Sequence, residues 1–204
     1  MAKITEVIPE QASLIIQRKI AEILLLELTN QKALQSLTSE FKVYTERIEP
    51  YDKSEDVVIS LALREATEGE HTADSGILNN VYFIDVFAGG QESQTEDVST
   101  NVHRKLSKYV GMIRYILSSP KYPTLGLPKG IVGNRHVMKL TYDTDYSNWG
   151  NHSNYDGAGI RFCRIIYSVT AVEYTALPTG VPLEGNDTII EIGTNKGIQL
   201  IFNG

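Results

Sequence analysis

The chain has 204 residues, a net charge of −6, and 42% hydrophobic and 22% charged residues, a globular composition that excludes a chain disordered throughout. The acidic balance argues against non-specific nucleic-acid binding by the whole molecule, because such binding needs Lys and Arg to neutralise phosphates. Cys163 is the single cysteine, so no intrachain disulfide and no cysteine-based zinc site can form.

The first part of the chain predicts one helix and one short extended segment. The first eleven residues lack an apolar signal core, and the apolar run at residues 20–28 contains Glu22 and Glu27, so we expect no export signal and no membrane span. Residues 9–29 place their apolar side chains on one broad face and predict an amphipathic helix ending near residues 29–30. Residues 41–43 suggest a short extended segment.

The middle of the chain predicts a hairpin followed by a second helix. Residues 57–63 and 81–86 alternate apolar and polar side chains as strands with one buried face do. Residues 65–80 are polar, and we expect them to form a long, mobile loop between the two strands. Residues 98–117 repeat apolar side chains at three- and four-residue steps, and the prolines of SSPKYP end this second helix.

The last third predicts the rest of the sheet. Residues 137–140 form a strand, and residues 160–172 form the longest strand-like run, which we expect in a central position with Cys163 buried as a small apolar side chain. The runs TIIEIG and IQLIFNG predict a terminal hairpin. The fold is then α+β: a mixed, mainly antiparallel sheet with two helices packed on one side and a small C-terminal hairpin. Residues 1–176 form the main domain and residues 177–204 a C-terminal extension.

Charge is distributed by segment. Residues 40–97 hold fourteen acidic and four basic residues, whereas residues 98–142 hold eight basic residues and no acidic one. The eight are Arg104, Lys105, Lys108, Arg114, Lys121, Lys129, Arg135 and Lys139. Either these charges balance within one molecule, or the subunit has an acidic and a basic side, which suits head-to-tail association. Under the second interpretation, Arg104, Lys105 and Lys108 are candidate interface residues.

Common catalytic motifs are missing. The chain has no phosphate-binding P-loop, no dinucleotide-binding glycine motif and no nucleophile elbow. Asp143, Asp145, His152 and Asp156 share one loop, but the glycine and terminal glutamate of a calcium loop are absent, so a solvated or partner-facing loop is the default. We therefore expect a protein that is not an enzyme and that holds no cofactor and no metal.

The loop at residues 143–156 is rich in aromatic side chains. Tyr146, Trp149 and Tyr155 are of types that favour protein interfaces when they lie on loops. Ordering a loop with few aliphatic residues costs roughly 1–2 kcal/mol per residue. We expect this loop to be mobile in the isolated subunit and ordered against a partner; the alternative is that some of these rings anchor the loop on its own sheet.

The order of the elements resembles the tail terminator, or tail completion, proteins of long-tailed bacteriophages, of the minor tail protein U type. The likeness covers residues 9–175. It is carried by IIQRKIAEILLLEL, SEDVVISLALREA, NNVYFIDVFAGG, VHRKLSKYVGMIRYILSS, RHVMKLTYDTDY and GAGIRFCRIIYSVTAVEY. Longer loops around residues 65–80 and 143–158 and the additional tail after Ala176 depart from the compact form of the family.

The resemblance implies a structural virion protein at the head-proximal end of a phage tail. Such proteins form a hexameric ring that ends tail-tube polymerisation and joins the tail to the head connector. The implied partners are further copies of the chain, the tail tube protein, a head–tail connector or neck protein and, in a contractile-tail relative, the tail sheath. No membrane is implied, DNA only passes through the ring lumen, and host cytoplasm is the place of assembly.

Two other readings stay open. Another neck or head-to-tail adaptor protein is the nearest alternative, and a small enzyme or ligand-binding α/β domain is the alternative from another class. A ring or hexamer in solution supports assembly, whereas a monomer that binds a small ligand does not.

Overall fold

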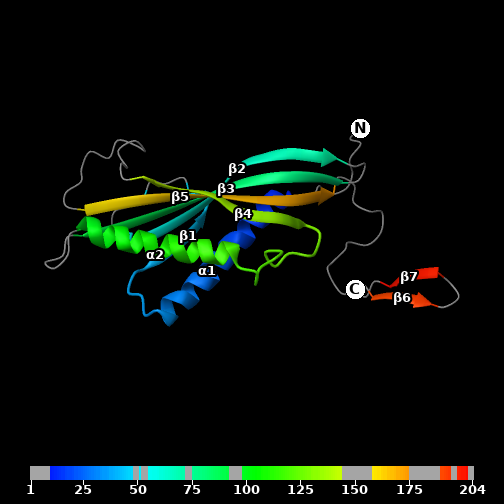
Figure 1. Cartoon of the computed structure of the whole chain (residues 1–204), viewed down its shortest axis with the longest axis horizontal. Helices are drawn as coiled ribbons and strands as arrows, with labels where there is room; N and C mark the ends of the chain where they lie inside the picture. Colours follow the sequence, from blue (N-terminus) through cyan, green and yellow to red (C-terminus); the bar gives the residue numbers. More distant parts are fainter. Residues whose placement is uncertain are drawn as a thin grey trace, which may run out of the picture.

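A computed structural model describes residues 10–47, 51, 55–71, 75–91, 98–143, 158–174, 189–193 and 197–201. In these residues each of two helices is followed by a run of strands (Figure 1). In order they are α1 (Ala12–Leu34), β1 (Phe41–Thr45), β2 (Val57–His71), β3 (Ser75–Gln91), α2 (Val98–Ser118), β4 (Val132–Asp143), β5 (Ala158–Tyr174), β6 (Ile189–Gly193) and β7 (Gly197–Ile201).

The main sheet has the strand order β1-β2-β3-β5-β4. β1 runs parallel to β2, and every other neighbouring pair is antiparallel. β3 is the middle strand, and β5 also pairs on both sides, which confirms that the longest strand-like run is interior. β6 and β7 pair with each other in a separate antiparallel sheet. The predicted α+β class is confirmed.

Both helices cover the same face of the main sheet (Figure 1). Each helix buries one stripe of apolar side chains, because residues three or four apart lie on one side of a helix. In α1 the buried apolar residues are Ala12, Ile16, Ile20, Leu24 and Leu28; in α2 they are Val102, Leu106, Tyr109, Val110, Ile113, Ile116 and Leu117. The two stripes form one core with the sheet.

Alternate residues of the inner strands complete this core. They are Tyr82, Ile84, Val86 and Ala88 of β3, and Cys163, Ile165, Tyr167, Val169 and Ala171 of β5. Full burial of a large apolar side chain contributes about 1.5–3 kcal/mol, so this alternation stabilises the fold strongly. Cys163 is among the buried residues, as predicted, and burial raises the pKa of its thiol from 9.0 to about 11.

Polar contacts fix the start of α1 on the sheet. The Tyr82 hydroxyl donates to the Ser13 carbonyl over 2.7 Å, and the backbone N–H of Ala12 donates to Oε1 of Glu173 over 2.6 Å. The amide of buried Gln17 donates to the Leu61 carbonyl over 3.0 Å. These bonds satisfy polar groups that the helix would otherwise bury without partners.

The predicted end of the first helix was wrong by about one turn. α1 continues to Leu34 rather than ending near residues 29–30. The segment between those positions contains no Gly or Pro to stop a helix. The helix ends where Ser36 takes a positive φ of 50°.

The prediction of a long loop at residues 65–80 was also wrong. β2 continues to His71 and β3 begins at Ser75, so this polar stretch extends the hairpin. Leu78 pairs with Glu68 on one side and with Ala171 of β5 on the other, and this two-sided pairing orders a sequence with weak strand character of its own. We call residues 64–71 of β2 and 75–80 of β3 the hairpin arm. In Figure 1 it reaches beyond α2.

Candidate interaction surface

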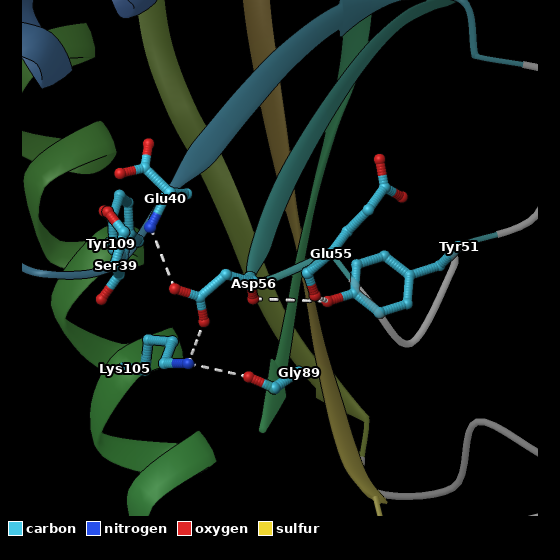
Figure 2. Close-up of polar contacts among 8 residues, drawn as sticks. All are labelled: Ser39, Glu40, Tyr51, Glu55, Asp56, Gly89, Lys105 and Tyr109. Atoms are coloured by element: carbon cyan, nitrogen blue, oxygen red, sulfur yellow. Dashed lines mark hydrogen bonds and ion pairs between the residues drawn. The ribbon is translucent and has the colours of Figure 1, made fainter. Parts of the chain in front are cut away.

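The first half of α2 is tied to the strands by Lys105 (Figure 2). Its ammonium group forms an ion pair with Oδ1 of Asp56 and donates to the Gly89 carbonyl over 2.8 Å. Oδ2 of Asp56 accepts the backbone N–H of Glu40 over 2.9 Å. The Asp56 carbonyl accepts from the N–H of Gly89 at 2.9 Å and from the Tyr51 hydroxyl at 3.3 Å. Asp56 therefore joins β1, β2, β3 and α2 at one point.

This junction bears on the predicted interface residues. Lys105 belongs to the basic segment and Asp56 to the acidic segment, so at this position the charges balance inside the subunit. The Lys105 side chain is only 17% exposed. Sequence reasoning grouped it with Arg104 and Lys108 because the three are close along the chain.

Arg104 and Lys108 lie on the exposed side of α2. They are four residues apart and share a helix face with Tyr115, whose exposed fraction is 78%. α2 contains no Asp or Glu, so the charged side chains of this helix are all basic. The other predicted interface residues, Tyr146, Trp149 and Tyr155, lie outside the described residues.

A basic groove runs along the outer edge of the sheet beside α2. It has a volume of about 530 Å³ and is lined by Arg114 and Ser118 of α2 and by residues 135–140 of β4. The Arg135 guanidinium donates to the carbonyls of Leu117 and Ser119, so it holds the C-terminal end of α2 against this edge. The residues of β4 from Val132 to Tyr142 include no acid.

The side chains at this edge are accessible. His136 and Lys139 are exposed, and Met138 and Tyr142 are 56% and 49% exposed. Partial burial raises the pKa of the Tyr142 hydroxyl above its ordinary value. The outer edge of β4 thus offers positive charge and apolar area, and no described strand pairs with it.

The hairpin arm carries the opposite charge. Glu65, Glu68 and Glu70 are all exposed in β2. Glu68 contacts His71 at 3.2 Å and Glu65 accepts the Thr67 hydroxyl over 2.9 Å, so these contacts stay within the arm. The arm lies at the β2 side of the sheet, and the basic groove lies at the β4 side.

In the part of the chain that the structure describes, no three His, Cys, Asp or Glu side chains gather as metal ligands would. Nor does any helix within the described ranges have the length and apolar character to cross a membrane. The loop holding Asp145, His152 and Asp156 lies outside those ranges.

Sequence reasoning did not single out the two sheet edges. Charge segregation by segment was the available signal, and it did separate Glu65, Glu68 and Glu70 from Arg135 and Lys139. It did not show that these groups lie on opposite edges of one sheet, because that depends on strand order. Asp56 was missed because its partners lie 16 and 49 residues away.

The chain was compared with family models, curated proteins and solved structures. No family model matches the chain, and no curated protein matches it. A solved structure with a similar course is the sheath/tube terminator of an extracellular contractile injection system, PVC, determined by cryo-EM in the extended state. It is 11% identical, with a TM-score of 0.41, and the match covers 93% of this chain and 67% of that chain.

Proposed function

We propose that the chain is a structural subunit of a tail-terminating ring. Copies of it close into a ring at the head-proximal end of a phage tail, end the polymerisation of the tail tube and join the tail to the head connector. The ring is a hexamer, and in a contractile particle it also meets the sheath. The protein acts by occupying a place in an assembly, with no chemical step.

The observation that carries this proposal is the separation of charge between the two edges of one sheet. An acidic strand edge on one side and a basic one on the other cannot satisfy each other within a subunit. They can meet when a second copy is placed beside the first in the same orientation. Such a heterologous contact repeats at every copy and closes into a ring when the rotation between copies allows it.

Two features of the sequence support a terminating role for the ring: the element order set out for residues 9–175 and the aromatic loop at residues 143–156. An amphipathic helix, a hairpin, a second amphipathic helix and two further strands succeed one another as in tail terminator proteins. Tyr146, Trp149 and Tyr155 are proposed to contact the tail tube or an adjacent ring, with Arg104 and Lys108 on the exposed face of α2 supporting contacts between assembled parts.

Native mass spectrometry combined with a tube-growth assay tests this function. We expect a closed oligomer of six copies that, added to polymerising tail tube protein, stops growth and remains at one end of the tubes. The variant Arg104→Glu/Lys108→Glu should weaken the ring or its capping, whereas Lys19→Glu/Glu22→Lys on α1 leaves net charge unchanged and serves as the control.

The outcomes separate the alternatives. A ring that binds tubes without stopping their growth indicates a neck or head-to-tail adaptor protein instead. A chain that stays monomeric at every concentration contradicts the proposed function. Wild-type capping by the Tyr146→Ala/Trp149→Ala/Tyr155→Ala variant excludes the aromatic loop as the contact.

A further inference from the structure

We propose that neighbouring copies join edge to edge, with β4 of one copy adding to residues 62–71 of β2 in the next copy. This contact rests on the proposed assembly and names the two surfaces that meet in it. The result is one continuous sheet that passes from subunit to subunit.

The first requirement is that both edges are open. β1 pairs with β2 only from Val57 to Leu61, and the N–H of Glu46 donates to the Leu61 carbonyl over 2.9 Å where this pairing stops. From residue 62 to His71, no described strand lies on that side of β2. Among the described strands, β4 pairs only with β5, along one of its sides. Unpaired backbone groups along such edges can accept another strand.

The second requirement is a compatible strand direction. β2 is antiparallel to β3, β3 to β5, and β5 to β4, so β2 and β4 run in opposite directions within one subunit. A second copy placed beside the first in the same orientation therefore presents its β2 antiparallel to β4. This is also the more stable ladder geometry per residue.

The alignment of the two strands follows from the position of β1. Within one copy, Ala62 pairs with Phe83, Phe83 with Ile166, and Ile166 with Lys139, so these four residues form one row across the sheet. If two copies met row for row, residues 140–143 of β4 would collide with β1 of the next copy, which lies along residues 57–61 of β2. Sliding β4 by four rows toward the tip of the arm removes this collision. A stagger of this kind is what tilted strands require when a sheet closes on itself.

The shifted alignment matches the side chains of the two edges. It puts Lys139 opposite Thr67 and diagonal to Glu65 on the face away from the helices, with Tyr142 opposite the partly buried Leu63. Opposite residues in such a pair have Cβ atoms about 4.5–5.5 Å apart, and diagonal ones remain within reach of long side chains. His136 then lies beside Gly69 and the acidic Glu70.

The apolar side chains at this edge gain cover in the same contact. Tyr142 and Met138 are each about half exposed in the free subunit. The arm of the next copy lies over Tyr142, and its outer strand fills the groove bordered by Arg114 and Ser118 of α2. The contact therefore combines backbone hydrogen bonds, complementary charge and apolar burial, as added strands do in other proteins.

Disulfide trapping tests the contact. A chain carrying both Thr67→Cys and Lys139→Cys should, on mild oxidation, give a ladder of covalent dimers, trimers and higher oligomers. An intrachain bond is excluded because the two positions are separated by three strand spacings, about 14 Å, and a disulfide needs Cα atoms within about 7 Å. Cys163 is buried and stays in place. Each single variant, and Lys19→Cys combined with Lys139→Cys, should give no ladder.

Charge exchange provides a second readout that needs no oxidation. Lys139→Glu alone, and Glu65→Lys alone, should each weaken association on the order of tenfold, because like charges then face each other across the strands. Combining both changes in one chain should restore association and leaves the net charge unchanged. Lys19→Glu/Glu22→Lys is the matched control on α1.

Failure of this contact is distinguishable from failure of the proposed function. A closed ring that forms without a Thr67–Lys139 ladder, and with no rescue by charge exchange, overturns the edge contact and leaves the ring. Without the four-row shift, His136 of one copy would lie opposite Glu65 of the next copy. A ladder of oligomers from Glu65→Cys combined with His136→Cys, and none from Thr67→Cys with Lys139→Cys, therefore overturns the shifted alignment. A strictly monomeric chain overturns both proposals.

Discussion

Two lysines one helical turn apart on α2 have different surroundings. Lys105 contacts the Asp56 carboxylate and the Gly89 carbonyl, whereas Lys108 is exposed. The Asp56 side chain is only 30% exposed and also receives the N–H of Glu40. Removing the ammonium group leaves this partly buried carboxylate with its charge unpaired, a larger loss than removing an exposed charge.

We expect Lys105→Met to lower the free energy of unfolding by about 1–3 kcal/mol, the range for leaving a buried hydrogen-bonding group without its partner. Lys108→Met should change it by less than about 0.5 kcal/mol, as surface substitutions do. Urea denaturation of the two variants beside the wild type measures both values. Equal effects at the two positions would contradict a structural role for the Asp56 junction.

In the hairpin arm, strand pairing outweighs the low strand propensity of the local sequence. Residues 75–80 of β3 include two asparagines and one glycine, which disfavour strands, yet β3 has a partner on each side along this stretch. β2 has β3 on one side and, past Leu61, no described strand on the other. The inner and outer strands of the arm therefore differ in how their backbone groups are satisfied.

Hydrogen exchange should distinguish these two strands. In dilute subunit, we expect the amides of residues 77–79 to exchange slowly, and those amides of residues 65–68 that point away from β3 to exchange fast. On assembly the second group should become protected, because the edge then has a partner. Fast exchange of residues 77–79 in both states would instead support the mobile loop that the sequence predicted for residues 65–80.

At the scale of the whole molecule, acidic and basic residues are concentrated in different parts of the chain, although the net charge is small. The net value of −6 combines an acidic stretch with a basic stretch that has no carboxylate at residues 98–142. The hairpin arm and the β4 edge present these charges on opposite sides of the sheet. Association through them depends on ionic strength, since the screening length falls from about 10 Å at 0.1 M to about 3 Å at 1 M salt.

We expect the dissociation constant of the assembly to rise on the order of tenfold over this salt range. Sedimentation velocity at several protein concentrations measures it. The Lys139→Glu variant is the internal control, because its weaker association should depend less on salt. Association that strengthens as salt rises indicates a contact dominated by apolar burial instead.

Periodicity in the sequence was sufficient to predict most of the secondary structure and the buried faces. The spacing of Ile16, Ile20 and Leu24, and the alternation of Ile165, Tyr167 and Val169, each identify one apolar side, and hydrophobic burial requires that side to face the core. The α+β class with both helices on one face followed from these patterns. So did the burial of Cys163.

Only the tertiary structure decided which segments meet. The continuation of β2 and β3 through residues 65–80 depends on β5, which lies about ninety residues further along the chain. The ion pair of Lys105 with Asp56, and the placement of acidic and basic side chains on opposite open edges, depend on strand order. Local sequence carries the pattern of burial, whereas pairing between distant segments is set by the packing of the whole chain.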